Sequence, residues 1–197
     1  MYKVYTVTDT FKLPPEHFGD DIEKVAEDVL QRKYEGLIDS SVGVVVAVFN
    51  VREISDGTIY PGDPSTHHDA KFDLLAFMPT VEEVVMGMVS ELVEFGAFVR
   101  IGPMEGLVHV SQIANDFLSF DKKTPAFVSK KTGKNLKKND VVYAKISTIS
   151  MKKTIKDSKI ALTMKPEGLG KLEWVTQEAK RGGRKPEDRG RRGKGKK

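Results

Sequence analysis

The chain has 197 residues, of which 39% are hydrophobic and 30% are charged, and it contains no cysteine. These values exclude a wholly disordered protein, a coiled-coil rod, a disulfide-stabilised mini-protein and any site built on a cysteine thiolate. The longest strongly apolar run, residues 42–49, is too short to cross a bilayer, and the first residues do not form a signal-peptide pattern. We therefore expect a soluble, cytoplasmic protein without membrane contact.

Charge is distributed unevenly along the chain. Residues 1–80 hold 7 Lys/Arg against 14 Asp/Glu, a net charge of −7, and residues 81–121 have a net charge of −6. Residues 122–165 hold 13 Lys against two Asp, a net charge of +11, and residues 180–197 have a net charge of +8. Such asymmetry indicates that the C-terminal half meets a polyanion and the N-terminal half a different kind of partner.

The first 79 residues predict a small α+β domain. Residues 3–11 alternate as a strand does, and residues 20–33 place Ile22, Val25, Ala26, Val29 and Leu30 on one face of a helix that ends near Gly36. Residues 42–51 form a β-branched run, which predicts a strand buried on both faces or at a domain seam. Short strands follow at 58–60 and 71–77, on either side of a rigid loop at 61–64. The order is β-α-β-β, and we place a domain boundary at residues 79–80.

Residues 80–180 predict a second, all-β domain. Five strands separated by glycines, at 84–93, 97–101, 107–110, 141–149 and 159–164, suggest a small closed barrel. A lysine-rich insertion at about 115–139 is treated as a long loop, which is typical of a functional or mobile segment. Residues 171–180 predict a short helix with Leu172 and Val175 on one face. Residues 181–197 lack apolar periodicity and predict a disordered basic tail.

Aromatic and basic side chains gather on two of the predicted barrel strands. Phe95 and Phe98 flank Gly96, Arg100 follows two residues after Phe98 on the same strand face, and His109 lies on the next strand. Rings beside cations suit single-stranded nucleic acid, because bases stack on the rings and cations hold the phosphates. The residue types alone equally allow both phenylalanines to be core residues and His109 to be a hydrogen-bonded barrel histidine.

The sequence around these residues resembles the RNA-binding repeat of ribosomal protein S1, an OB-fold barrel. The pattern Phe-Gly-Ala-Phe-Val matches residues 95–99, and Gly-Leu-Val-His-Val-Ser matches residues 106–111; the closing strands match at 139–142 and 159–164. The resemblance implies RNA contact through Phe95, Phe98 and His109. Two positions depart from the family pattern, with Ser150 in place of a common Asp and Lys159 in place of a common Arg.

A wider resemblance covers residues 1–179. The β-α-β-β domain, Tyr34-Glu35-Gly36, Tyr60-Pro61-Gly62-Asp63, the barrel insertion and Leu169-Gly170-Lys171-Leu172-Glu173-Trp174 occur together in the family of the E-prime stalk subunit of archaeal RNA polymerase, which is similar to the seventh subunit of eukaryotic RNA polymerase II. It implies an RNP-like tip domain at 1–79 followed by an S1-type barrel at 80–180. Pro64 departs from the family, where glycine is common, and proline fixes φ in this loop.

The resemblance also implies partners and sites for a non-catalytic subunit that needs no cofactor or metal. The tip would dock on the core polymerase subunits near the clamp, a helical stalk partner (the F subunit of such enzymes) would pack along both domains as a heterodimer, and the barrel would contact nascent single-stranded RNA. The predicted RNA-binding residues are Phe95, Phe98, Arg100, His109, Lys122, Lys123, Lys130, Lys131, Lys134 and Lys145. The predicted core-polymerase contacts are Ile59, Tyr60, Pro61, Gly62, Asp63, Pro64 and His67.

Two other functions are weighed against this one. A free-standing S1-type RNA-binding factor in translation or RNA decay would share the barrel, and only the N-terminal domain argues against it. A nuclease or other RNA-modifying enzyme would need a catalytic domain, but only about 80 residues lie outside the barrel and the sequence shows no clustered metal-binding carboxylates. The segment His67-His68-Asp69 is interpreted as a surface or contact loop rather than a metal site.

Overall fold

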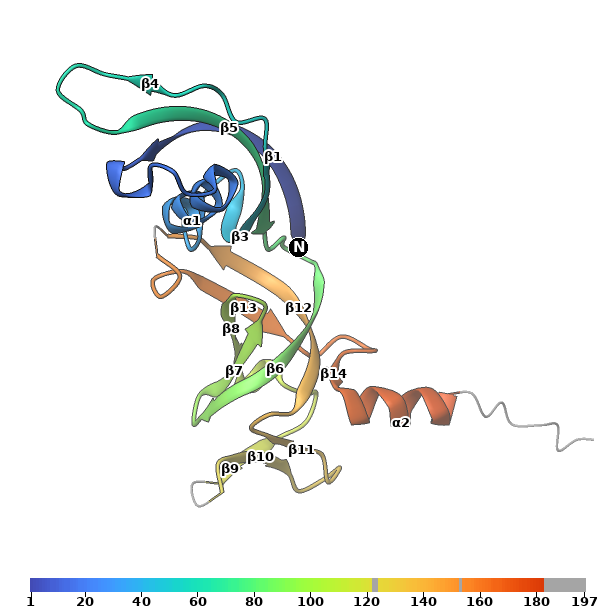
Figure 1. The fold of residues 1–197 in the computed structure, drawn as a ribbon. Coiled ribbons are helices and arrows are strands. Elements are labelled where there is room, and N and C mark those ends of the chain that lie inside the picture. The colour runs from blue at the N-terminus through green and yellow to red at the C-terminus, as the bar shows by residue number, and fades with distance from the viewer. Residues whose placement is uncertain (122–123, 153, 183–197) are drawn as a thin grey trace, which may run out of the picture.

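The computed structural model describes residues 1–121, 124–152 and 154–182. Two units are stacked end to end, and helix α2 projects from the second (Figure 1). We call them the tip (residues 1–79) and the barrel (residues 80–182). Lys122 and Lys123 of the predicted RNA-binding set lie outside the described residues. So does most of the predicted disordered tail, because the described helix α2 ends at Gly182.

The tip is a curved antiparallel sheet with one helix on its concave side (Figure 1). Its elements are β1 (Tyr2–Leu13), η1 (Pro15–His17), α1 (Ile22–Tyr34), β2 (Ile38–Asp39), β3 (Gly43–Arg52), β4 (Thr58–Ile59) and β5 (Thr66–Phe77). The strand order is β1-β5-β3-β2, with β4 beside β5. The apolar stripe of α1 packs on the sheet as its periodicity predicts, with Ala26 and Leu30 fully buried. The predicted RNP-like β-α-β-β arrangement is confirmed.

The second unit contains a closed five-stranded barrel. Its strands are β6 (Val84–Val93), β7 (Gly96–Ile101), β8 (Met104–His109), β12 (Val141–Ser150) and β13 (Lys159–Thr163), and the short helix η2 (Val110–Gln112) follows β8. The antiparallel order β8-β7-β6-β12 is closed by β13, which pairs with β12 on one side and runs parallel to β8 on the other. This closure is the predicted OB-fold, and it leaves no free edge among these five strands.

The insertion is not a simple loop, and the prediction on this point is wrong. Strands β9 (Leu118–Asp121), β10 (Ala126–Ser129) and β11 (Asn135–Lys137) form a separate three-stranded sheet at the end of the barrel farthest from the tip (Figure 1). Phe127 and Leu136 pair across β10 and β11 and are fully buried in the barrel's hydrophobic core. Short apolar stretches within a lysine-rich segment are thus enough for a sheet, because the barrel supplies the surface that covers them.

The C-terminal helix lies close to its predicted range. After β14 (Gly170–Lys171), which pairs with β12, helix α2 spans Leu172–Gly182. Leu172 is 41% exposed, and Trp174, which the sequence prediction did not single out, is the residue that enters the core, with 7% exposure. The side of α2 that faces the barrel follows from β14, because the pairing of β14 with β12 sets where the helix begins.

An apolar seam joins the tip to the barrel. Val44 of β3 and Phe77 at the end of β5 belong to the barrel's core cluster, whereas Val45 and Val48 face α1. The N-terminal half of β3 is therefore buried on both faces, as the unbroken β-branched run predicts. An ion pair also crosses the seam, because the N-terminal ammonium of Met1 in the tip lies 3.4 Å from a carboxylate oxygen of Glu83 in the barrel. The two units therefore share one core at their junction.

Candidate nucleic-acid interface

Three adjacent barrel strands present one continuous outer face. In β7, Ala97 and Val99 point into the barrel core and are fully buried, so Phe98 and Arg100 face outward. The register places Phe98 opposite Leu107 of β8, and Leu107 opposite Ala161 of β13. Alternation along each strand therefore brings Phe98 and Arg100 of β7, Leu107 of β8 and Ala161 of β13 onto the same surface.

A groove of about 770 Å³ lies over this face. Phe95, in the turn between β6 and β7, is 52% exposed, and its ring meets the ring of Phe98 edge to face with centroids 6.3 Å apart. Gly96 separates the two because a β-carbon there would lie 2.3 Å from the Val108 carbonyl oxygen. The Phe-Gly-Ala-Phe motif thus folds two aromatic rings onto one wall of an open groove.

The opposite wall comes from the loop between β12 and β13, which the sequence motifs do not assign to the site. It contributes Ile155, Lys156 and Ser158, and Lys159 at the start of β13 also lines the groove. The Ser158 hydroxyl donates to Thr154 O at 2.8 Å and thereby closes the loop into a tight turn. The signal that could have found it is the cluster of lysines between two predicted strands, which the S1 motif does not include.

Arg100 has a weak ion pair. Its Nε atom lies 3.9 Å from a carboxylate oxygen of Glu105 on β8, and both side chains are about half exposed. An exposed pair at that separation contributes little to stability, so the guanidinium is free to exchange Glu105 for a phosphate. The positive charge on the groove is therefore available to an anionic ligand.

His109 combines a surface position with a structural role. It lies on the outer face of β8, two residues beyond Leu107, and it is exposed. Its Nδ1 atom caps helix η2 by accepting a hydrogen bond from Ser111 N at 3.3 Å, and it lies 2.8 Å from the Ser111 hydroxyl. Nε2 is the ring nitrogen left for a ligand. The proposed RNA contact and the alternative of a hydrogen-bonded barrel histidine are thus compatible.

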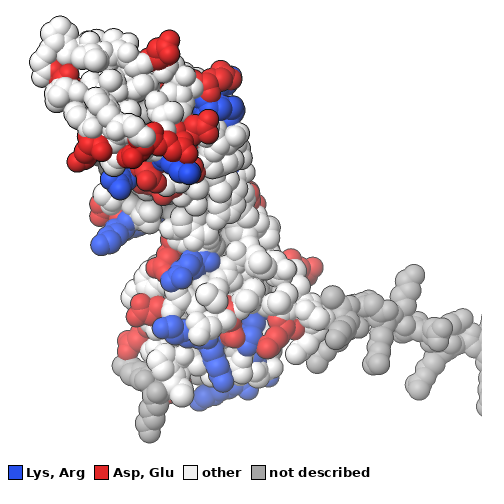
Figure 2. Space-filling model, in the orientation of Figure 1, with Lys and Arg blue, Asp and Glu red and all other residues white. Residues whose placement is uncertain are grey.

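The lysines that were predicted to bind RNA and that the structure describes do not gather at this groove. Lys130 and Lys131 are exposed in the turn after β10, Lys134 lies with its Nζ atom 5.2 Å from the ring centroid of Trp174, and Lys145 forms an ion pair with Glu82 beside the seam. Figure 2 nevertheless shows acidic side chains crowding the tip and basic ones gathering toward the far end of the barrel. The structure therefore brings Phe95, Phe98 and Arg100 together, with His109 on the same face, and places these lysines elsewhere.

The loop between β4 and β5 presents apolar side chains at the far end of the tip. Ile59 and Tyr60 are 67% and 54% exposed, and Pro61, Gly62 and Pro64 are exposed as well. Gly62 adopts a φ of +86°, which favours glycine, and Asp63 N donates to Tyr60 O at 3.0 Å to close the turn. Pro64 has no N–H to donate, and the turn does not need one there because the next donor, Ser65 N, bonds to the Asp63 side chain. Exposed apolar residues on a pinned loop are typical of a protein contact.

Asp63 is the residue that pins this loop. Its carboxylate binds the Lys12 ammonium at 2.9 Å, accepts from Ser65 N at 3.0 Å and lies 3.0 Å from His67 Nε2. The hydrogen bond from Lys12, followed by those from Ser65 and His67, holds the pKa of Asp63 well below its ordinary value of 3.8. His67 also packs edge to face on Tyr60, with centroids 4.9 Å apart. Three of the predicted contact residues, Tyr60, Asp63 and His67, are therefore linked to one another.

We expect acid to loosen this loop, and Asp63→Asn to loosen it at neutral pH. Because the folded-state pKa of Asp63 is lowered, its stabilising effect is fully present above pH 3.8 and is lost as the pH falls further. Hydrogen exchange at the Ser65 amide is the measurement. It should be several-fold faster in the variant than in the native chain at neutral pH, with the exchange of core amides unchanged. Equal exchange in both proteins would show that Asp63 does not hold the loop.

His67 and His68 do not converge on a common point. His68 is buried, with its Nδ1 atom 3.0 Å from Ser55 O, its Nε2 atom 2.8 Å from the Thr66 hydroxyl and its ring stacked on Phe11. Within the described ranges, His, Cys, Asp and Glu side chains form no group of three suited to a metal ion. Helices in the described part of the chain are likewise too short or too polar to span a membrane.

Comparison with known proteins assigns both units. Residues 8–64 match the SHS2 domain found in the N terminus of Rpb7p/Rpc25p/MJ0397, and residues 78–160 match the S1 RNA binding domain. The chain is 37% identical over 180 residues to the DNA-directed RNA polymerase subunit Rpo7 of Saccharolobus shibatae, covering 91% of this chain and all of that one. It is 37% identical to Rpo7 of Sulfolobus acidocaldarius, over 90% of this chain and 97% of that one.

A eukaryotic relative matches much of the same chain at lower identity. The DNA-directed RNA polymerase II subunit rpb7 of Dictyostelium discoideum is 24% identical over 148 residues, which cover 74% of this chain and 86% of that one. The match to the archaeal proteins runs through the tip, the seam and the barrel without a missing unit. The resemblance drawn from the sequence motifs is confirmed, and the chain belongs to the family of the DNA-directed RNA polymerase subunit Rpo7.

Proposed function

We propose that this protein is a non-catalytic stalk subunit of a DNA-directed RNA polymerase that acts in the cytoplasm, where its tip docks on the core enzyme near the clamp and its barrel binds emerging single-stranded RNA. The full-length match to Rpo7 supports the assignment to the polymerase. The observation that carries the RNA-binding role is the open groove on β7, β8 and β13, where Phe95, Phe98 and Arg100 meet. Two rings and a cation are what a base and its phosphate need.

The tip is suited to a protein partner rather than to RNA. Its net charge of −7 repels a polyanion, whereas Ile59 and Tyr60 project apolar surface from a loop that Asp63 holds in place. A pre-organised apolar loop loses little conformational entropy when it inserts into a complementary pocket. We therefore propose that residues 59–67 form the contact with the core polymerase.

A second surface fits the helical stalk partner. Val84, Met86 and Met88 face outward on β6 and are 52%, 61% and 40% exposed. Tyr2 and Val4 of β1 are 49% and 58% exposed across the seam, and the Tyr2 hydroxyl lies against Gly102, which lines a shallow depression with Met86 and Met88. An apolar stripe that crosses both units suits a helical partner that packs along both and stabilises their arrangement.

Affinity purification of the tagged chain from its native host tests the proposal. We expect the large polymerase subunits and a small helical protein to be retained, and Met86→Asp to lose the small protein because a carboxylate would be buried in the contact. Glu91→Lys, an exposed charge change on the same strand, is the matched control and should retain it. Recovery of ribosomal or RNA-decay proteins without polymerase would favour the free-standing RNA-binding factor instead.

A further inference from the structure

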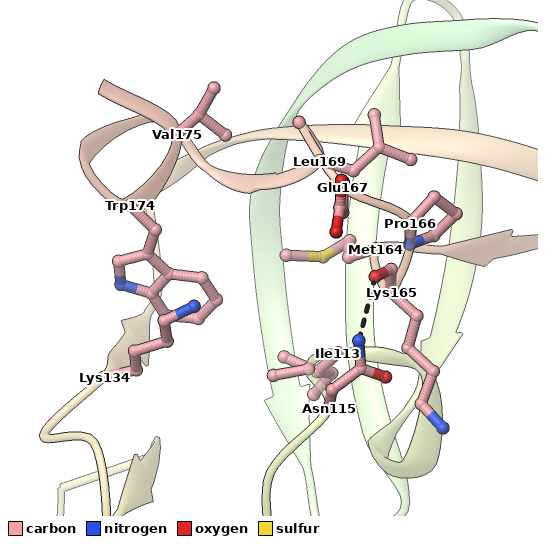
Figure 3. Close-up of a pocket in the computed structure, with 12 residues that line it drawn as sticks. Ile113, Asn115, Lys134, Met164, Lys165, Pro166, Glu167, Leu169, Trp174 and Val175 are labelled. Atoms are coloured by element: carbon pink, nitrogen blue, oxygen red, sulfur yellow. Dashed lines mark hydrogen bonds between the residues drawn. The ribbon is translucent and has the colours of Figure 1, made fainter. Parts of the chain in front are cut away.

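A second cavity, of about 640 Å³, lies at the end of the barrel beside the C-terminal helix. Figure 3 shows the ring of Trp174 on one side, the Met164 side chain reaching toward it, and Asn115 and Lys165 on the other side. Ile113, Leu169 and Val175 complete the apolar lining, and Glu167 is the acidic residue in it. An apolar cavity with a few polar groups at its rim is the usual form of a ligand site.

Ion pairs of one buried lysine hold in place the elements that surround this cavity. Lys171, which is only 7% exposed, binds Asp140 and Glu173 at 3.0 Å and approaches Asn135 of β11 at 3.5 Å, so it ties the start of α2 to the insertion sheet. Burial opposes its charge, but the hydrogen bonds to Glu173 and Asp140 outweigh that effect and raise the pKa of Lys171. The same link brings Trp174 of α2 under Lys134, whose Nζ atom lies 5.2 Å from the ring centroid.

Two strands that line the aromatic groove lead into the lining of this cavity. β13 lines the groove at Lys159 and Ala161, and the residues that follow it, Met164 and Lys165, line the cavity. β8 lines the groove at Leu107, passes His109 and leads through η2 to Ile113 and Asn115. Two hydrogen bonds join these continuations: Met164 N donates to Gln112 O at 2.8 Å, and Asn115 Nδ2 donates to Lys165 O at 3.2 Å.

The spacing suits one polynucleotide. Ala161 and Lys165 are four residues apart, which is about 13 Å along an extended strand. OB-fold sites cover about 4–16 nucleotides, so a strand held by Phe95 and Phe98 is long enough to reach Lys165. The charge also suits RNA, because Lys134 and Lys165 belong to the segment of residues 122–165, whose net charge is +11.

We propose that this cavity is a second RNA subsite, which takes a nucleotide of the strand that leaves the aromatic groove. Its base would enter the apolar space beside Met164 and Trp174, and its phosphate would lie between Lys134 and Lys165. The subsite rests on the proposed function, because it extends the groove rather than replacing it. It also gives the insertion sheet a role, since that sheet supplies Lys134 and supports Trp174.

Trp174 provides a direct readout, because it is the only tryptophan in the chain. Its emission would be followed while the full chain is titrated with single-stranded RNA of about 12 nucleotides, and total binding would be measured in parallel by the anisotropy of labelled RNA. We expect the emission to change with the same concentration dependence as the anisotropy. Trp174→Phe should abolish the emission signal, which verifies the source of the signal.

The double variant Lys134→Ala/Lys165→Ala should remove the emission change and weaken binding of this RNA about tenfold, with a salt slope lower by about 0.7 for each phosphate that is no longer neutralised. The control variant Lys24→Ala/Lys71→Ala removes the same charge from the tip. It should leave the emission change, the affinity for RNA and the salt slope as they are in the native chain. Because Lys134 contacts Trp174, thermal unfolding of each variant is compared first, and Lys165→Ala alone serves if the double variant is unstable.

Three results would overturn the subsite, and they differ in what they imply for the proposed function. If RNA binds by anisotropy but Trp174 emission does not change, the cavity is not on the RNA path and the groove alone carries binding. If the emission responds only to added core polymerase or to the helical stalk partner, the cavity is a protein contact. If anisotropy detects no RNA binding at all, both the subsite and the RNA-binding role of the barrel fail.

Discussion

Replacing Phe95 and Phe98 with alanine is expected to weaken the binding of single-stranded RNA by about 1–3 kcal/mol for each ring, which is a loss of about 5- to 150-fold in affinity per ring. The two rings meet edge to face on an open groove, so each can stack on a base, and the loss should vary little with RNA sequence because every base has a stacking face. Fluorescence anisotropy with labelled RNA at fixed salt concentration measures the effect.

The matched control is Phe117→Ala. Phe117 is 85% exposed and lies outside the groove-lining set, so its removal should leave groove binding nearly unchanged. Recovery of the double variant with the polymerase should also be unchanged, because the proposed contacts are at residues 59–67 of the tip. Loss of polymerase recovery together with RNA binding would show that the two phenylalanines support the fold and would remove their assignment as a stacking site.

Phe77→Ala is expected to cost about 3–5 kcal/mol of unfolding free energy, the range for a fully buried aromatic residue. Phe77 is 1% exposed, it ends a strand of the tip, and its side chain belongs to the core cluster of the barrel. The ring of Tyr2 packs edge to face on it, with centroids 5.2 Å apart. Its removal therefore leaves a cavity that both units line. Chemical denaturation followed by circular dichroism measures the loss.

The space left by Phe77→Ala lies between the tip and the barrel, so we also expect the substitution to lower the cooperativity of unfolding. With the seam weakened, the tip and the barrel should unfold in separable steps, and the single unfolding transition should broaden or split. Phe49→Ala is the control, because Phe49 is 38% exposed on β3 and its truncation leaves no enclosed cavity. A loss below about 1 kcal/mol for Phe77→Ala would contradict the shared core and would imply that the two units are held together in another way.

The seam also explains how the two proposed contacts work in one protein. Residues 59–67 lie in the tip, and the groove lies on the barrel, so their separation is fixed only if the units do not move relative to each other. Val44 and Phe77 extend from the tip into the barrel's core cluster, and the N-terminal ammonium of Met1 pairs with Glu83 of the barrel at 3.4 Å. A rigid junction thus holds the RNA face at a set position relative to the docked loop.

Much of this organisation is determined by local sequence. The apolar spacing of residues 22–30 specifies α1, because a helix repeats every 3.6 residues and the stripe needs a sheet to cover it. The motif at 95–99 fixes the two rings and the close approach at Gly96, since any β-carbon there would meet the Val108 carbonyl. Alternation along β7 then places Phe98 and Arg100 on one face. The helix and the alternation depend on neighbours within a few residues, and the approach at Gly96 involves the next strand of the same hairpin. Sequence patterns and motifs record such relations directly.

The remaining features were decided by contacts between distant parts of the chain. The insertion forms a sheet because the barrel buries Phe127 and Leu136. Lys134 lies over the ring of Trp174 and not at the groove. Lys145 pairs with Glu82, 63 residues earlier, and the loop before β13 closes the groove although the family motif does not include it. A lysine-rich segment predicts affinity for an anion, but it does not predict on which surface the lysines gather. The position of each ammonium group depends on which strand, ring or carboxylate the fold places beside it. Local pattern thus determined the elements and the aromatic wall, whereas the tertiary structure alone decided which charges meet it, where the second cavity opens and which residues join the two units.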